Sequence, residues 1–447
     1  MAEAIIRGGL VVTETAVQAA DVRITGEIIE AVGPDLHGGG EEIDARGLHV
    51  FPGLIDVHVH FNEPGRTEWE GAASGSRALA AGGGTLFFDM PLNSTPCVVN
   101  VREAVAKREA LEAASITDFA LWGGLVPGSV REMEEMAHCG VVGFKAFLCD
   151  SGLPEFARAD DLTLYEGLHE AARLNLPVAV HAESHEITSA LARRCMEQGR
   201  TEVRDFLASR PVIAEVEAIQ RAALLAAEIG AKLHIVHVSS GRGVAVAAEA
   251  RTRGCDVSIE TCPHYLSFTE EDIERLGAAA KCAPPLRDSQ VQASLWQHVL
   301  NGTVDIVGSD HSPAPPEMKC GDFWRAWGGI AGVQSTLAVL LERGYRQRGL
   351  PLKRIVSLIA GEPARRFGIR SKGAIEAGKD ADLVLVDLSQ TRTLTREALL
   401  QRHAISPYLG ESFHATVKRT ICRGETIYAD GRITAQSHGR LVRPERN

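Results

Sequence analysis

The amino-acid sequence predicts an α/β protein: a (β/α)8 TIM barrel with a small β-sandwich domain built from both chain termini. Between residues 54 and 309, eight apolar segments alternate with helical segments, which is the pattern of parallel strands joined by helical crossovers. Short strands separated by glycine turns occupy both ends of the chain. Histidine, lysine and aspartate recur where the predicted barrel strands end, and barrel active sites lie at that edge.

The central strands have the number needed to close a barrel. Helices such as residues 212–230, rich in alanine and glutamate, separate neighbouring strands. An open, doubly wound sheet is the alternative, but no Gly-x-Gly-x-x-Gly turn follows the first strand to favour it. The predicted strands are residues 54–59, 85–90, 118–122, 142–147, 178–181, 233–238, 256–260 and 304–309.

Both chain ends are predicted to form short strands. Gly8-Gly9 and Gly26-Glu27 are the expected hairpin turns near the N-terminus, and a C-terminal hairpin turns at about Gly424. Neither set of strands can bury both faces alone. We therefore expect residues 1–50 and 378–447 to form one small β-sandwich domain, beside a barrel domain of residues 51–377. The predicted strands are residues 4–7, 10–13, 21–25, 28–32, 381–387, 417–423 and 426–429.

Length and composition limit the classes of function. A chain of 447 residues could hold about three domains, but single barrels with insertions also exceed 400 residues. The net charge of -11 argues against nucleic acid or an anionic membrane as partner, so a small-molecule substrate is expected. Nine cysteines without a Cys-x-x-Cys pair predict reduced thiols in the cytoplasm. Neither a secretory leader nor an apolar run of about 18 residues is found, so no membrane span is expected.

The first predicted barrel strand carries two histidines. His58 and His60 are two residues apart on an extended chain, so their side chains point to the same side and can bind one ion. Glu63-Pro64-Gly65 then breaks the strand, which places the pair at its C-terminal end. Two core histidines packed in a sheet are the alternative.

Further polar residues follow other predicted strands. Lys145 lies inside the apolar fourth strand, where an isolated ammonium group must lose its charge or find anionic partners. His181 ends the fifth strand, His237 the sixth, and Asp310 the eighth. Because these ends meet at one mouth of a barrel, their recurrence favours a catalytic site over separate structural roles.

In combination, these motifs resemble the cyclic-amidohydrolase branch of the amidohydrolase superfamily over essentially the whole chain. The resemblance implies two divalent metal ions. Zn2+ is the expected metal, and Co2+, Mn2+, Ni2+ or Fe2+ are the alternatives. It also implies that CO2 converts Lys145 to N6-carboxylysine, whose anionic carbamate bridges both ions. Asp310 would be both a ligand and the catalytic base. The implied metal ligands are His58 and His60 for one ion, His181 and His237 for the other, and Lys145 and Asp310.

The implied reaction is metal-assisted hydrolysis of a ring amide, and the loops indicate which ring. Dihydroorotases carry a carboxylate-binding arginine two residues after the second histidine, where this chain has Asn62. Dihydropyrimidinases and hydantoinases carry a tyrosine shortly after the lysine, and residues 147–152 contain none. Residues 61–71, 89–93, 312–319 and 327–330 instead closely resemble allantoinases.

We therefore expect hydrolysis of the hydantoin ring of (S)-allantoin to allantoate in purine breakdown. Activity as a dihydropyrimidinase, hydantoinase or dihydroorotase is the enzymatic alternative, and an inactive scaffold homologue is the other, because fold alone does not give function. A homodimer or homotetramer is implied by the resemblance. The candidate substrate contacts are Asn62, Asn93, Cys282 and Gly329. For Cys282 the favoured alternative is a small buried side chain without a reactive role.

Overall fold

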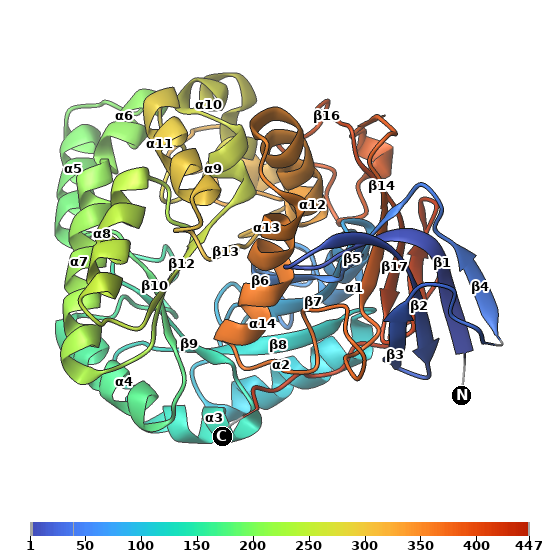
Figure 1. Cartoon of the computed structure of the whole chain (residues 1–447). Helices are drawn as coiled ribbons and strands as arrows, with labels where there is room; N and C mark the ends of the chain where they lie inside the picture. Colours follow the sequence, from blue (N-terminus) through green and yellow to red (C-terminus); the bar gives the residue numbers. More distant parts are fainter. Residues whose placement is uncertain (1–2, 39, 446–447) are drawn as a thin grey trace.

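A computed structural model describes residues 3–38 and 40–445, and it contains a parallel barrel with a mixed sheet at its side (Figure 1). The barrel strands follow one another in chain order, from β6 to β13. A bridge between Val59 and His311 brings the last strand back to the first, so the barrel is nearly closed. The strands are β6 (Leu54–Val59), β7 (Gly84–Asp89), β8 (Asp118–Gly124), β9 (Gly143–Phe147), β10 (Val178–His181), β11 (Leu233–Ile235), β12 (Val257–Thr261) and β13 (Ile306–Val307).

The predicted barrel is confirmed, with differences at the strand ends. β6 and β10 have the predicted limits, whereas β11 and β13 are shorter than predicted. His237 and Asp310 have φ angles of 39° and 46°, and a left-handed residue cannot continue a strand. His237 lies inside the predicted range 233–238 and keeps β11 short, whereas β13 is limited to the two residues that pair with β12, Ile306 and Val307. Both left-handed residues place the chain in turns at the barrel mouth.

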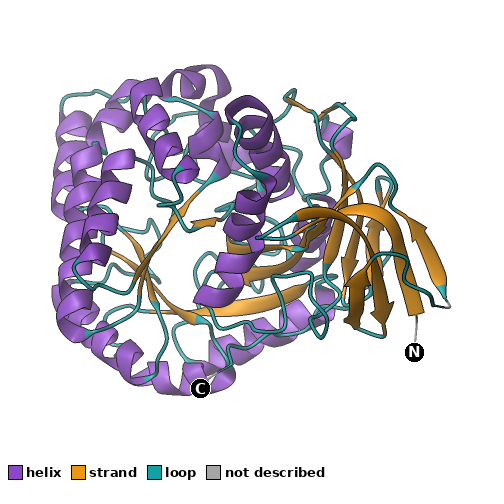
Figure 2. Ribbon diagram, in the orientation of Figure 1, coloured by secondary structure: helices purple, strands orange, loops and turns teal. Residues whose placement is uncertain are grey.

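Helices surround the ring of strands (Figure 2), and several begin at a side chain that caps them. Asn100, Asp160 and Ser240 each accept a hydrogen bond from a backbone N–H in the first turn of α2, α4 and α8, which satisfies a donor that the helix leaves free. The helices are α1 (Ala72–Ala81), α2 (Val101–Ala114), α3 (Met133–Cys139), α4 (Asp161–Arg173), α5 (His185–Glu197), α6 (Val203–Ser209), α7 (Val212–Ile229), α8 (Gly241–Thr252), α9 (Pro263–Ser267), α10 (Glu270–Leu276), α11 (Ser289–Leu300), α12 (Thr336–Val339), α13 (Leu352–Val356) and α14 (Glu362–Arg366).

The two chain ends meet in one mixed sheet, as predicted, because β5 pairs antiparallel with β14. This sheet has an apolar core of its own. The domain limits at residues 50/51 and 377/378 stay a prediction. The strands are β1 (Glu3–Val12), β2 (Val17–Thr25), β3 (Ile28–Gly33), β4 (Glu41–Asp44), β5 (His49–Pro52), β14 (Leu383–Asp387), β17 (Thr416–Cys422), β18 (Glu425–Ala429) and β19 (Arg432–Ile433), and β15 (Arg392–Thr393) pairs separately with β16 (Ser412–Phe413).

The predicted hairpin at Gly8-Gly9 is wrong. β1 runs through both glycines, and its register with β2 shifts between Ile6 and Gly9. Gly8 has a φ of 67°, so the glycines form a bulge that keeps the strand paired instead of reversing it. The chain reverses after β1, where the Thr13 N–H donates to the Ala16 carbonyl at 2.9 Å.

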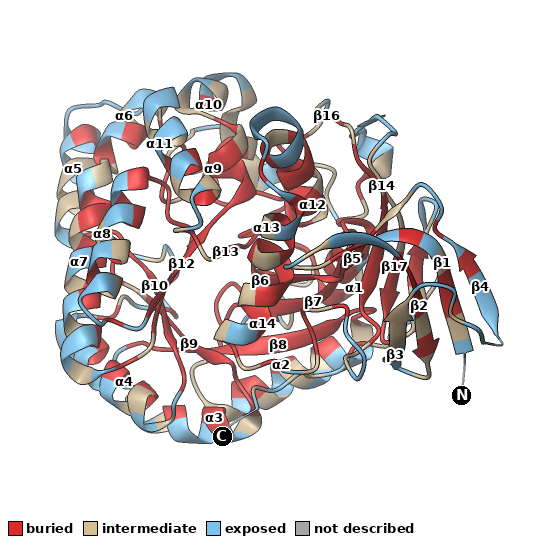
Figure 3. Cartoon of the chain, in the orientation of Figure 1, coloured by how far each residue is buried: buried red, intermediate tan, exposed pale blue. Residues whose placement is uncertain are grey.

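Burial follows the layers of the barrel. Every residue of β6, β7, β8 and β10 is buried, whereas the outward faces of the helices are exposed (Figure 3). Strands covered on both faces are expected to be apolar, so the polar residues found on them need a specific explanation. Within the described ranges, no helix is long and apolar enough to cross a membrane.

Lys372 joins the barrel to the mixed sheet. Its buried ammonium group lies 2.8 Å from Asp118 at the start of β8, and 2.9 Å and 2.6 Å from Asp380 and Asp382 before β14. Lys372→Met should lower the free energy of unfolding by about 3 kcal/mol, because Asp380 and Asp382 would lose their cation and only Asp118 would stay paired, with Arg423. The shift of the urea midpoint measures this loss. Lys418→Met, at a partly exposed position of β17, should leave the midpoint nearly unchanged.

Candidate metal centre

A cavity of about 510 Å³ lies at the C-terminal ends of the barrel strands. His58 and His60 come from the end of β6, and His181 ends β10. His237 and Asp310 follow β11 and β13 in the left-handed turns described above. All five side chains line the cavity, so the fold brings together residues that are up to 252 positions apart.

The imidazole and carboxylate groups lie within coordination range of one another. Asp310 Oδ1 is 3.2 Å from His58 Nε2 and 3.5 Å from His60 Nε2, and His181 Nδ1 is 3.0 Å from His237 Nε2. Ligand atoms of His58, His237 and Asp310 all lie within 4.8 Å of one another. Nitrogen and oxygen donors in this arrangement are typical of a site for divalent zinc or a related ion.

Lys145 lies on β9 and is fully buried. Its ammonium nitrogen has no hydrogen-bond partner among the described residues and lies 5.1 Å from the centre of the Phe147 ring. Burial lowers the pKa of Lys145 to about 8, which increases the fraction of neutral amine that can react with CO2. An unpaired buried donor is costly, and a carbamate between two cations would remove that cost. The donor set therefore fits the two ions that the resemblance implies.

Glu260, at the end of β12, orients two of the histidines and was not assigned a role from the sequence. Its carboxylate lies 2.9 Å from His58 Nδ1 and 3.0 Å from His234 Nε2, and it accepts a hydrogen bond from the His237 backbone N–H. Burial raises the pKa of Glu260, but His58 and His234 outweigh it and hold the pKa at about 2. An ionised Glu260 fixes the proton on His58 Nδ1, so Nε2 faces the cavity as a free ligand.

A second carboxylate holds His181. Glu183 Oε2 lies 2.8 Å from His181 Nε2, and the Arg210 guanidinium pairs with the same oxygen. Cys149, His181 and Glu183 also lie within 4.8 Å of one another, but Arg210 already neutralises Glu183, so this group is poorly suited to a further cation. Arg210 comes from the loop between α6 and α7, and no sequence motif pointed to it.

Three of the four predicted substrate contacts line the cavity: Asn93, Cys282 and Gly329. Asn62 does not: its side chain is fully buried, and its Nδ2 lies 3.5 Å from the Pro313 carbonyl instead. The cavity lining therefore gives no support to a direct contact by Asn62. Burial raises the pKa of Cys282 to about 12, which leaves a neutral thiol and agrees with the unreactive alternative.

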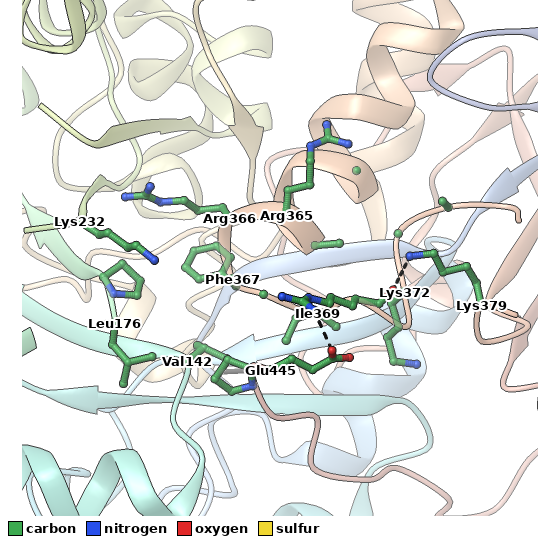
Figure 4. A pocket seen from close by; sticks show the side chains of 18 of the residues that line it. Val142, Leu176, Lys232, Arg365, Arg366, Phe367, Ile369, Lys372, Lys379 and Glu445 are labelled. Atoms are coloured by element: carbon green, nitrogen blue, oxygen red, sulfur yellow. Dashed lines mark hydrogen bonds and ion pairs between the residues drawn. The ribbon is translucent and has the colours of Figure 1, made fainter. Parts of the chain in front are cut away.

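Another cavity, of about 440 Å³, lies at the opposite end of the barrel strands (Figure 4). Its cationic side chains are largely paired: Arg365 binds Glu14, Arg366 binds Asp256, and Lys372 binds its three aspartates. Its described lining contains no histidine or cysteine. The cavity with the histidines is therefore the candidate active site.

A nearly closed parallel barrel with this ligand cluster at its C-terminal mouth is typical of metal-dependent hydrolases. The model of the Amidohydrolase family matches residues 49–427. Since this match covers most of the chain, the protein belongs to the amidohydrolase family.

Individual relatives narrow this class. The chain is 65% identical to an allantoinase from Solibacter usitatus over 448 residues, covering 100% of this chain and 98% of that protein. It is 60% identical to an allantoinase from Rubrobacter xylanophilus over 99% of this chain and 98% of that protein, and 41% identical to an allantoinase from Escherichia coli K12 over 95% and 94%. The predicted resemblance to allantoinases is confirmed, and the chain groups with them inside the family.

Solved structures show the same fold. An L-hydantoinase (dihydropyrimidinase) from Arthrobacter aurescens superposes with a TM-score of 0.96 at 33% identity, covering 99% of this chain and 100% of that chain. A dihydropyrimidinase from Brevibacillus agri gives 0.92 at 31% identity, over 98% of both chains. Fold similarity thus extends across several ring specificities, and the substrate must be argued from the site.

Proposed function

We propose that this protein hydrolyses the hydantoin ring of allantoin to allantoate in purine breakdown, with (S)-allantoin as the preferred enantiomer. The observation that carries the proposal is the cavity in which four histidines and Asp310 converge. The buried Lys145 lies close enough for its charge to help lower the pKa of His237. Similarity to allantoinases over the full chain supports the choice of ring.

Six side chains would hold two divalent metal ions, and Asp310 is one of them. His58 and His60 would bind one ion, His181 and His237 the other, and the carbamate of Lys145 would bridge them. The chemistry that such ions supply is polarisation of the ring carbonyl and a fall in the pKa of water from about 15.7 toward about 7. Zn2+ suits imidazole and oxygen ligands, and Co2+, Mn2+, Ni2+ or Fe2+ could replace it.

Asp310 would move the proton. Burial raises its pKa, but His58, His60 and His237 outweigh burial and hold the pKa well below its usual range. The carboxylate is therefore ionised and can accept a proton from the attacking water. It then donates this proton to the ring nitrogen as the amide bond breaks.

The rest of the cavity favours a neutral ring over a charged one. Of its two arginines, Arg210 is paired with Glu183, and the side chain of Arg325 is 90% exposed. A dihydroorotate carboxylate would find neither guanidinium free and buried, and an unmatched charge in a closed site is costly. The Asn93 side chain, which lines the cavity, offers neutral hydrogen-bonding groups to a ureido substituent instead.

A comparison of four substrates tests the proposal. Allantoin should give the highest kcat/KM, and hydantoin, dihydrouracil and dihydroorotate should each be at least about tenfold poorer, because each lacks the ureido group or adds a charge. The measurement is kcat/KM for each substrate with zinc-loaded protein. If hydantoin or dihydrouracil exceeds allantoin, the chain acts as a dihydropyrimidinase and the proposed substrate is wrong.

We also propose a cytoplasmic homodimer or homotetramer. Leu162 on α4 and Leu224 on α7 are 64% and 71% exposed, and exposed apolar side chains on neighbouring helices favour contact with another protein surface. Sedimentation equilibrium tests the oligomer, and a monomer at micromolar concentration would contradict it.

A further inference from the structure

Residues 323–329 form one wall of the candidate active-site cavity. This segment belongs to the long loop after β13, and all of its residues from Trp324 to Gly329 line the cavity. It has no helix or strand of its own. Backbone carbonyls in such a segment need partners from elsewhere.

Lys281 supplies partners for the first half of the wall. It lies in the loop after α10, is 5% exposed, and lines the same cavity. Its ammonium group donates to the carbonyls of Phe323, Trp324 and Ala326 at 2.7, 3.0 and 2.7 Å. The same nitrogen lies 4.8 Å from the centre of the Phe206 ring, so carbonyl dipoles and a ring face surround the charge.

Lys319 supplies partners for the second half. Its ammonium group donates to the Trp327 carbonyl at 3.0 Å, to the Ala278 carbonyl at 3.2 Å, and to the Gly329 carbonyl. The Gly329 N–H in turn donates to the Lys281 backbone carbonyl at 2.8 Å. The N–H of Gly329 is therefore bound by the Lys281 backbone, and its carbonyl by the Lys319 side chain.

Burying the ammonium groups of Lys281 and Lys319 costs free energy unless both groups stay hydrogen-bonded to the carbonyls around them. In the described part of the chain, no acidic side chain forms an ion pair with either lysine. A lysine ammonium has three N–H donors, and each of these two finds three carbonyl oxygens. Burial lowers the pKa of Lys281 to about 8, and burial together with the charge of Lys281 lowers the pKa of Lys319 to about 7. The carbonyl oxygens oppose both shifts because they accept hydrogen bonds from the charged form.

We propose that Lys281 and Lys319 are positioning residues that hold residues 323–329 as a rigid wall and thereby set which ring substituent the active site accepts. Trp327 and Gly329 would meet the substituent on the hydantoin ring, and the two lysines act on it only through this backbone. The specificity part of this inference rests on the proposed hydrolysis of a cyclic amide. The rigidity of the wall does not.

The rate of trypsin cleavage after Arg325 measures how readily residues 323–329 open. The Arg325 side chain is 90% exposed, whereas the carbonyls of its neighbours Trp324 and Ala326 are bound by Lys281. Lys281→Met and Lys319→Met keep an apolar side chain of similar length and remove the three donors. We expect cleavage at Arg325, followed by mass spectrometry, to become at least about tenfold faster in each variant. Lys353→Met is the matched control, because Lys353 also donates to a carbonyl, that of Thr15, far from the cavity.

Kinetics separate positioning from a general loss of structure. In both variants KM for allantoin should rise about tenfold, with a smaller change in kcat. The ratio of kcat/KM for allantoin to kcat/KM for hydantoin should fall. The metal content should stay at the value of the parent protein. Lys319→Met, at a less buried position, keeps the experiment decisive if Lys281→Met fails to fold.

Unchanged cleavage at Arg325 in the folded variants would overturn the proposal, whichever substrate the protein uses. Faster cleavage with an unchanged substrate preference would overturn the specificity role. A parent protein that leaves allantoin intact would instead refute the proposed function, because the cleavage assay needs no substrate.

Discussion

Lys145→Ala is expected to lose the two-metal site and to lower kcat/KM by at least about 10³-fold, because metal-assisted hydrolysis requires the ions that lower the pKa of water. The physical reason is the position of Lys145: fully buried on β9, without a hydrogen-bond partner among the described residues. A bridging anion built on this side chain explains why a lysine is tolerated there. Metal analysis after dialysis and the hydrolysis rate measure the two losses.

Chemical rescue distinguishes a missing bridge from a damaged fold. Short carboxylic acids, such as acetate or propionate, should enter the space left by Lys145→Ala and restore part of the metal content and part of the activity. Lys232→Ala, which removes a half-buried lysine at the other end of the barrel, should change neither property. Two tightly bound ions and normal turnover in Lys145→Ala would refute the carbamate.

Asp310→Asn should retain most of the metal but lower kcat by roughly 10² to 10⁴, the usual contribution of a general base. An amide oxygen can still contact an ion, but it cannot accept the proton of the attacking water. The low pKa of Asp310, which the neighbouring histidines impose against burial, is consistent with a carboxylate that acts in its ionised form. Metal content and kcat, measured on the same preparation, test the separation of the two roles.

Asp35→Asn is a suitable control, because Asp35 is exposed in a turn of the mixed sheet with a φ of 48°, which asparagine adopts readily. Near-normal turnover in Asp310→Asn would require another base. His264 would be the first residue to examine, since both of its ring nitrogens are buried without a partner and burial lowers its pKa to about 4.

Patterns that act within one segment were readable from the sequence. Alternation along an extended chain placed His58 and His60 on one side, and the apolar run around Lys145 showed that a charge would be buried. Repetition of strand and helix predicted the barrel, whose parallel strands necessarily bring their C-terminal ends to one mouth. The grouping of the metal ligands therefore followed from local signals plus one property of the fold.

The ends of strands were less predictable where the chain turns away from the sheet without a glycine or proline to mark the turn. His237 adopts a left-handed φ angle that no local motif announces, so β11 ends earlier than its apolar run suggests. β13 is short because only Ile306 and Val307 pair with β12. At Gly8-Gly9 the sequence predicted a turn where the strand in fact continues, because pairing with β2 keeps both glycines inside β1.

The sequence by itself determined the barrel, the joining of both termini in one sheet, and the residues that converge at the mouth. Only the tertiary structure showed that Glu260 and Glu183 bind the histidines, that Asn62 lies outside the cavity lining, and that two lysines donate hydrogen bonds to carbonyls of the cavity wall. The physical reason is that periodicity gives the direction of a side chain relative to its own strand or helix. Which group from a distant segment it meets there depends on how loops of different lengths pack, and that is decided by the folded chain as a whole.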